Sequence, residues 1–496
     1  MSNIVVGKDV IELLGSAMYR DPLSIYREYI QNAVDSIDDA VKDGLLKDAS
    51  ESKIDISVNN IERIIRIRDN GTGVSKKTFK RKMLSIGASG KRASSARGFR
   101  GIGRLSGLGY CQELIFRTRA KGQDVSQLKW NIRAIKKALS DNKNDADLAK
   151  LIEETTEFQS FPSDEYPEHF FEVEMVKPLR LGGDILLNLD RVKNYLSQVA
   201  PVPFSNDFTL AKQIRTHLQE NGGLNEYNIF INHSEDALCK AYSDTISFSE
   251  TKKVTFTGNL DLIAINDANG NISAAGWIAH SDYQGAIPPR SLVGGLRARV
   301  GNLQIGERDL FVDAFPEPRF NSWSVGEIYI ISKKIIPNGR RDGFEQNKQL
   351  SDLQIRLLPY CHDIAKQCRK QSALRNTQKR IDSLLVKAAE GLEVLNQGVL
   401  SEHAQSDRKS QIKGVISEVE YLLPSAEVSD KYTKNVNREL SKLKSAILSV
   451  KNNGQLKSNL TEQEQIIFSK FCELIYDCSS NQGNAKALID KILVRL

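Results

Sequence analysis

The sequence predicts an α+β protein in three parts, and the distribution of residue types along the chain supports each part. Residues 1–178 alternate helical segments with short strands, and residues 179–345 are rich in strands with one or two helices. Residues 346–496 form a helical region with spaced Leu and Ile and few helix breakers. A chain of 496 residues is too long for one hydrophobic core, so about three domains are expected.

The composition narrows the class of protein. Hydrophobic residues make up 40% and charged residues 26% of the chain, which is ordinary for a soluble globular protein. The sequence contains no run of about 18 apolar residues, the length that a transmembrane helix needs, so no membrane partner is expected. The N-terminus lacks the basic and apolar segments of a secretory signal. The six cysteines form no Cys-x-x-Cys pair, which favours free thiols and no zinc site. We therefore expect a cytoplasmic protein.

A helix with one polar face is the first motif. Glu28, Asn32 and Asp35 are spaced i, i+4 and i+7, which places their side chains along one face of a helix. The opposite face is apolar, so the segment is amphipathic. The residues of that apolar face are Ile25, Tyr29, Ile30 and Ile37. On its own a polar face is typical of a solvated helix surface, and the motifs that follow decide between the two interpretations.

A strand that runs into a glycine-containing turn is the second motif. The strand Ile64–Arg68 leads directly into Asp69-Asn-Gly71-Thr-Gly73. Gly71 and Gly73 permit positive φ and a close approach of the backbone to a ligand. An acid that follows a buried strand needs a hydrogen-bond donor. The exocyclic amine of adenine is such a donor, so Asp69 would select adenine over guanine. The alternative is a plain Asp-Asn-Gly turn.

A basic, glycine-rich segment is the third motif. Residues 76–104 contain ten basic residues, no acidic residue and five glycines, and they end in Gly98-Phe-Arg-Gly101-Ile-Gly103. This segment is too polar for a core and predicts a mobile lid. Its charge suits a triphosphate or a nucleic acid backbone, and the alternative is a solvated basic helix face. In this order, the three motifs indicate a nucleotide-binding fold that uses Mg²⁺ and ATP.

The polar helix face has the residue types that this chemistry needs. Mg²⁺ prefers oxygen ligands, and the Asn32 amide supplies one without adding negative charge beside a triphosphate. Glu28, one turn earlier, can orient or deprotonate a water directed at the γ-phosphate. Asp35 can anchor the lid or the water network around the ligand.

The three motifs, with their order and spacing, resemble those of the GHKL ATPases. This superfamily includes gyrase B, the ninety-kilodalton heat-shock chaperones, sensor histidine kinases and MutL, with the MORC ATPases as relatives. The resemblance covers about residues 5–175. It implies a Bergerat-type domain, in which a mixed sheet has helices on one face, followed by a transducer-like α+β domain. The resemblance also implies Glu28 as the general base, Asn32 as the Mg²⁺ ligand and Asp69 as the acceptor for the adenine amine.

Further site residues follow from the same resemblance. Gly73 and Met83 would lie against the adenine base, and the backbone at Gly98, Gly101 and Gly103 would hold the phosphates. The family often has a phosphate-facing Thr in a late strand. The similar strand here, residues 169–173, reads His-Phe-Phe-Glu-Val and lacks it.

An arginine far along the chain completes the resemblance, which is greatest to the chaperone-like branch. Members of that branch have an arginine in the second domain that reaches the γ-phosphate, within a segment similar to Pro-x-Asn-x-Ser-Arg-Glu. Residues 336–342 read Ile-Pro-Asn-Gly-Arg-Arg-Asp, with Arg341 at the matching place and Arg340 as the second choice. A cationic fork stabilises phosphoryl charge. The alternative is two basic residues in a surface turn.

The remaining elements are predicted from periodicity and turn residues. Residues 121–168 are interpreted as a polar excursion on the surface. A 4-3-4-3 spacing of apolar residues over 436–450 predicts a helix with a coiled-coil-like seam, which serves either a dimer or packing within the chain. Thr461-x-x-Glu464 is a capping-box helix start. A tight turn at Gly301-Asn302 predicts a hairpin. The middle part is expected to contain helix 190–199 and strands 227–231, 251–257, 260–265, 296–300 and 303–305.

Two functions compete. In the first, ATP closes the lid and docks Arg341, and the C-terminal helices hold a homodimer that acts on an unidentified protein partner as a chaperone-like clamp. In the second, a MutL- or MORC-like ATPase is directed to DNA by the basic segment 76–104 and the basic C-terminal helices. A sensor histidine kinase is disfavoured, since no His lies on a dimerisation helix ahead of the ATPase domain. A nucleotide-gated component of a bacterial defence system against phage is a further possibility, based only on the small size of the chain and on the lack of a recognisable client or nuclease domain.

Overall fold

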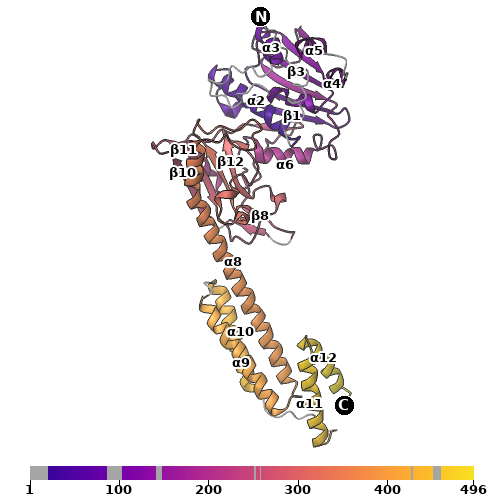
Figure 1. Cartoon of the computed structure of the whole chain (residues 1–496), viewed down its shortest axis with the longest axis vertical. Coiled ribbons are helices and arrows are strands. Elements are labelled where there is room, and N and C mark those ends of the chain that lie inside the picture. The colour runs from indigo at the N-terminus through magenta and orange to yellow at the C-terminus, as the bar shows by residue number, and fades with distance from the viewer. Residues whose placement is uncertain are drawn as a thin grey trace. The chain divides into compact units, whose positions relative to one another are not determined.

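The computed structural model in Figure 1 has the predicted α+β class. It describes residues 21–85, 103–140, 148–250, 253–256, 258–425, 428–450 and 460–495. The chain divides into two compact units between residues 366 and 367. The first unit contains two large sheets, and the second unit is helical.

The first sheet has seven strands in the order β5-β4-β3-β6-β2-β1-β7. Neighbouring strands are antiparallel except for the parallel pair β1 and β7, so the sheet is mixed as predicted. The strands are β1 Ile54–Asn59, β2 Ile64–Asp69, β3 Glu113–Arg119, β4 Val125–Asn131, β5 Thr156–Phe161, β6 Phe170–Val176 and β7 Ile229–Ile231.

The prediction that residues 121–168 form a surface excursion was wrong. This segment contains β4 and β5, which extend the sheet at one edge, with helices α4 (Ile132–Ser140) and α5 (Leu148–Thr155) between them. The reason is the alternation in β4, where Leu128 and Trp130 are fully buried between more polar neighbours. Such alternation is the pattern of a strand with one buried face, and the polar residues obscured it in the sequence.

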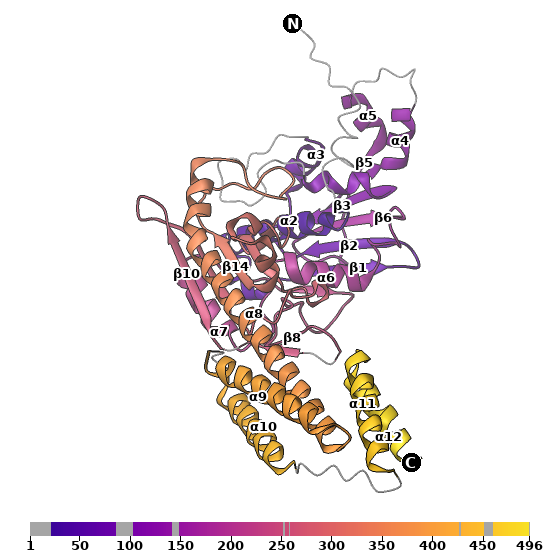
Figure 2. The same cartoon turned by 60° about the horizontal axis from the view of Figure 1, so that its bottom comes forward.

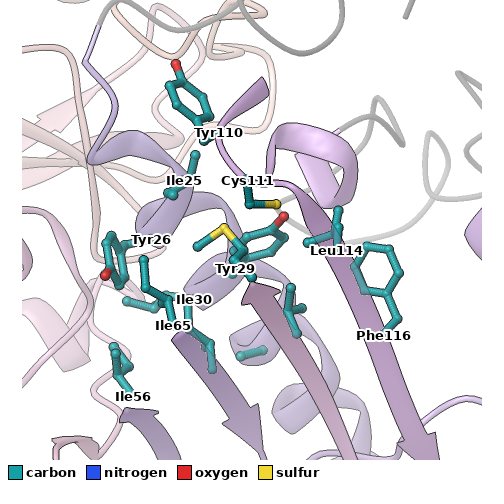
Figure 3. Close-up of a cluster of buried hydrophobic side chains, with 14 of the residues drawn as sticks. Ile25, Tyr26, Tyr29, Ile30, Ile56, Ile65, Tyr110, Cys111, Leu114 and Phe116 are labelled. Carbon is teal, nitrogen blue, oxygen red and sulfur yellow. The ribbon is translucent and has the colours of Figure 1, made fainter. Parts of the chain in front are cut away.

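Helix α2 (Ser24–Lys42) packs on one face of this sheet. The predicted amphipathic pattern is confirmed, because Ile25, Tyr29 and Ile30 are buried in a core shared with the strands (Figure 3). The Tyr29 hydroxyl accepts a 2.9 Å hydrogen bond from Gly107 N, which ties α2 to the 3-10 helix η3 (Gly103–Gly109). Two further helices flank these elements, α3 (Lys76–Leu84) and α6 (Leu189–Val199).

The opposite face of the sheet has a ladder of ion pairs. Glu172 on β6 lies between Arg68 and Arg117, with nitrogen–oxygen distances of 2.5 and 2.8 Å. Glu174 pairs with Arg66 at 2.6 Å and with Arg117 at 3.0 Å. Burial raises the pKa of Glu174, but the hydrogen bonds and charges of the two arginines outweigh burial and lower that pKa below its usual value.

The second sheet has five strands in the order β10-β11-β14-β12-β13. The predicted hairpin is confirmed, since β12 and β13 are joined by Gly301 and Asn302, both with positive φ. Helix α7 (Ala211–Glu220) contributes to the core beside this sheet. The strands are β10 Leu260–Asn266, β11 Ile272–Ala279, β12 Gly295–Val300, β13 Leu303–Ile305 and β14 Val325–Ile330. The short elements are β8 Thr245–Ser247, β9 Lys253–Thr255, η1 Ala49–Glu51, η4 Pro289–Ser291, η5 Val312–Ala314 and η6 Pro318–Trp323.

The chain crosses between the two sheets more than once. After α6 it enters the second core at Phe204, returns to the first sheet as β7, and then leaves again. As a result, the first core extends to Ile231, and residues after 178 contribute both α6 and β7 to it.

A buried charge cluster lies where these crossings meet the second sheet. Glu327 on β14 is fully buried and pairs with Arg299 and with Lys240, whose Nζ is 2.8 Å from Glu327 Oε2. Burial opposes ionisation of Glu327, but the two cations outweigh burial and lower its pKa to about 2. Arg299 also donates to Gln198 O at the end of α6, at 2.6 Å. The cluster therefore joins the second sheet to a helix of the first core.

The second unit consists of helices. Helix α8 (Lys348–Asn396) begins in the first unit and continues into the second, where α9 and α10 lie side by side along it (Figure 2). The apolar seam of α10 is buried within this unit, which favours packing within the chain over a dimer contact at this seam. The predicted capping box at Thr461 and Glu464 is confirmed. These helices are α9 Glu402–Ser425, α10 Asp430–Ser449, α11 Glu462–Cys478 and α12 Gln482–Leu493. Among the described residues, no helix is both long and apolar enough to cross a membrane.

Candidate functional site

The polar face of α2 forms one wall of the candidate site. Glu28 and Asp35 are buried, each with 4% of its surface exposed, and Asn32 is half-buried. Gly103 lies directly against Glu28, since a Cβ added to Gly103 would be 2.6 Å from Glu28 Oε2. The glycine loop therefore ends beside the acid that the sequence selected as a general base. Gly98 and Gly101, and most of the predicted lid, lie outside the described residues.

Asp69 lies at the end of β2, and its surroundings perturb its titration. Its Oδ1 accepts a 2.9 Å hydrogen bond from Gly71 N. Burial raises the pKa of Asp69 to about 7, against the hydrogen bonds from Gly71 and from the Ser36 side chain, which lower it. A buried carboxyl with this pKa suits a further donor, which would stabilise the ionised form.

The turn after Asp69 requires glycine at two positions. A Cβ on Gly71 would lie 2.1 Å from Ser36 Oγ, so glycine allows the turn to approach α2. Gly73 has φ +67°, and a Cβ there would lie 2.0 Å from Arg119 O. Met83, predicted to pack on a nucleotide base, is buried in the core that α2 shares with the sheet.

Three residues that sequence reasoning missed support this turn. The Thr118 hydroxyl donates to Phe170 O at 2.8 Å and accepts from Val74 N at 2.9 Å. His169 Nδ1 is 2.8 Å from Gly71 O, and Ser36 lies against Gly71 as described above. Thr118 and His169 come from strand β3 and the start of β6. Only the pairing of those strands with each other and with β2 brings the two residues to the turn, so the sequence contained no local signal for them.

Arg341 contacts Glu28 across a long sequence separation. The Arg341 Nε atom is 3.1 Å from Glu28 Oε1, and both side chains are largely buried, with 13% and 5% exposed. Arg27 also lies beside Glu28, at 3.7 Å, and donates to Arg340 O at 3.3 Å. The Arg340 side chain is exposed. Of the two arginines considered from the sequence, Arg341 is therefore the one that reaches the polar face of α2.

The residues present fit a magnesium nucleotide. Mg²⁺ held mainly by phosphates needs only one or two protein oxygens, and Asn32, one helical turn from Glu28, can supply one. Within the described part of the chain, no group of three or more His, Cys, Asp and Glu residues forms a metal cage. Gln31 on α2 is 1% exposed, and among the described residues neither of its amide atoms has a hydrogen-bond partner, so both are available to a polar ligand.

The comparisons with known proteins agree with this geometry. Residues 27–164 match the family described as "Histidine kinase-, DNA gyrase B-, and HSP90-like ATPase". The matched segment begins just before Glu28 and includes Asp69, Gly103 and strands β1 to β5. No curated protein matches the chain. The N-terminal part is thus a GHKL-type ATPase domain, which confirms the predicted superfamily and supports ATP binding and ATPase activity.

The first prediction concerns the space at Gly73. Gly122 has a similar φ of +75°, but no atom of the described part of the chain lies within 4 Å of a Cβ added there, so it is a matched control. We expect Gly122→Ala to cost about 1–2 kcal/mol, from backbone conformation alone. Gly73→Ala should cost clearly more, because its Cβ overlaps a backbone carbonyl, and it should weaken ATP binding. Urea unfolding and calorimetric titration with a non-hydrolysable ATP analogue measure the two effects. Equal losses of stability would contradict this assignment.

The second prediction concerns the titration of Asp69. A donor on the adenine stabilises the ionised carboxylate, so binding should release a proton and strengthen as the pH rises through about 7. Below that pH, affinity for the analogue should fall by up to about tenfold per pH unit. Asp69→Asn should bind more weakly and should lose this pH dependence. Calorimetric titrations between pH 6 and pH 8 test both statements, and a dependence that survives in Asp69→Asn would exclude Asp69 as its source.

Proposed function

We propose that the chain is a chaperone-like conformational clamp, in which ATP hydrolysis at α2 is coupled to the second sheet and acts on a protein partner. The observation that supports this proposal is the 3.1 Å ion pair between Arg341 and Glu28. Arg341 follows the last strand of the second sheet, and Glu28 belongs to the ATPase domain. A cation from one part of the chain thus reaches the polar face that would hold the nucleotide.

The proposed chemistry divides the work among four side chains. Glu28 accepts a proton from the water that attacks the γ-phosphorus, and the bond to the β,γ-bridging oxygen breaks to give ADP and phosphate. Arg341 stabilises the charge on the transferred phosphoryl group through its fixed fork of donors. Asn32 would hold Mg²⁺, which neutralises phosphate charge when it is bound. Asp69 fixes the adenine end of the nucleotide.

The proposed conformational cycle uses competition for Arg341. Arg341 is paired with Glu28 at 3.1 Å, and its fork of donors can bind a phosphate as well as a carboxylate. The γ-phosphate is a second anion that can bind Arg341, and such binding would release Glu28 from the pair. The glycine-rich part of the basic segment, which ends at Gly103 against Glu28, would close over the nucleotide in the same step. Helix α3 would not move with it, because its Met83 is buried in the core. A homodimer in this cycle would use exposed apolar residues of α11, such as Phe471 and Leu474, since the α10 seam is already buried.

The third prediction tests the two catalytic assignments. Glu28→Gln should bind ATP about as well as the parent protein but hydrolyse it roughly 10²–10⁴ times more slowly, because the base is lost. Arg341→Ala should lower kcat by about 10³-fold or more through loss of charge stabilisation. Arg340→Ala is the matched control and should keep the parent rate, since its side chain is exposed. Steady-state phosphate release measures the rates, and unchanged turnover in a Glu28→Ala variant would refute the base assignment.

A nucleic-acid-directed ATPase is the second candidate function, and helix α3 favours it. Five basic side chains on α3 are exposed, and no acidic residue interrupts them. They are Lys76, Lys77, Lys80, Arg81 and Lys82. Lys76 pairs with Asp124 at 3.1 Å.

The fourth prediction separates the two functions. If α3 contacts phosphates, affinity for duplex DNA should fall steeply as salt rises, with a log–log slope of about −0.9 for each neutralised phosphate. Replacing Lys80 and Arg81 by Gln should reduce that slope by about two. Fluorescence anisotropy between 50 and 200 mM salt gives the slopes. DNA affinity that is absent, or that is independent of salt, would leave the clamp as the function.

A further inference from the structure

The turn that presents Arg341 has a conformation that its own residues do not favour. Arg341 is a non-glycine residue with φ +57°, in the left-handed region. The turn is closed by an isolated bridge between Pro337 and Phe344 and by a 3.0 Å hydrogen bond from Asn338 N to Gly343 O. A residue held in this region persists when its surroundings determine its backbone. Contacts from outside the turn are therefore needed to keep Arg341 directed at Glu28.

One such contact comes from the end of strand β13. Gly306 N donates a 2.9 Å hydrogen bond to Arg341 O. Gly306 itself has φ +66°, and a Cβ there would lie 3.0 Å from Asp342 O. The backbone at Gly306 thus packs closely against the Arg341 turn and fixes the carbonyl of the residue that contacts Glu28.

The position of Gly306 is in turn held by a buried amide. Gln304 is 2% exposed, and its Nε2 donates to Gly306 O at 3.0 Å. Its Oε1 accepts from Arg297 Nη1 at 2.9 Å. Arginine can only donate, so Arg297 forces the oxygen of the Gln304 amide toward itself and the NH₂ group toward Gly306.

Arg297 is itself immobilised on the far side from Arg341. It is 2% exposed, donates to Leu292 O at 2.9 Å, and donates to Gln198 Oε1 on α6 at 3.2 Å. A continuous series of hydrogen bonds therefore connects α6 of the first core, through Arg297, Gln304 and Gly306, to Arg341.

We propose that Gln304 is a positioning residue for ATP hydrolysis, which acts by holding Gly306 and through it the Arg341 turn. This inference rests on the proposed role of Arg341. Gln304 touches neither Glu28 nor the polar face of α2, so its effect on the reaction is exerted entirely through Arg341. Gln304 therefore controls the rate of turnover and does not affect the binding of adenine at Asp69.

The fifth prediction tests this role with a double-mutant cycle. Gln304→Met keeps the length of the side chain but removes both hydrogen bonds, and it should lower kcat about tenfold with the KM for ATP unchanged. In an Arg341→Ala background it should have no further effect, because the residue it positions is absent. Gln304→Glu keeps the bond from Arg297 but loses the donor to Gly306 O, and it should show the same loss of kcat in a well-folded protein.

Asn321→Leu is the matched control. Asn321 is a buried amide beside strand β12, the neighbour of β13, where it accepts from Leu296 N. It does not contact the Arg341 turn, so parent kcat is expected. A loss of kcat by Gln304→Met of equal size with and without Arg341 would overturn the inference and indicate a structural effect. If both Gln304 variants keep the parent kcat while Arg341→Ala has a lowered kcat, this inference alone is overturned. Parent kcat in Arg341→Ala would overturn both the inference and the proposed role of Arg341.

Discussion

The buried ion cluster around Glu327 is the constraint on which the arrangement of the first unit depends. Three charges with no access to water are costly to bury unless each is paired, so Glu327, Arg299 and Lys240 must stay together. Arg299 also binds a carbonyl at the end of α6, and Lys240 lies where the chain leaves the first core for the last time. Separating α6 from the second sheet here would take the Gln198 carbonyl away from the buried Arg299 side chain. The cluster therefore joins the second sheet to the first core at this place.

Helix α2 has two faces that contact different parts of the first unit. One face presents Glu28 and Asn32 to the candidate site. The adjacent face meets chain segments that belong to the crossings or to the second sheet, where Tyr227 donates to Asp38 at 2.5 Å and Arg27 donates to Arg340 O. Helix α2 therefore contacts both regions directly, and a shift of α2 caused by a ligand at Glu28 would act on the contacts at Asp38 and Arg27.

Sequence reasoning found the parts of the fold that depend on local pattern. The α2 face, the strand ending in Asp69 and the hairpin at Gly301-Asn302 follow from periodicity and turn chemistry, and the structure confirms each of them. Sequence reasoning did not find β4 and β5, because their polar residues obscured the alternation of buried and exposed positions. It also did not find that Glu172 and Glu174 pair with arginines on neighbouring strands. Ser36, Thr118 and His169 support the turn at Gly71 through strand pairing or packing that no local spacing reveals. Arg341 was found only through a resemblance.

The pairing of Arg341 with Glu28 constrains how hydrolysis can occur in the proposed function. The Arg341 guanidinium lies 3.1 Å from Glu28 Oε1, and the transferred phosphate is a second anion that it can bind. Binding of the phosphate would therefore require Arg341 to leave Glu28 or to share its donors between the two anions. Because the Arg341 turn is anchored to the second sheet through Gly306, a change in the partner of Arg341 would transmit ATP binding to that sheet. The release of Glu28 from Arg341 and the coupling of ATP to the second sheet would then be one event, which mutation of Arg341 cannot separate into two.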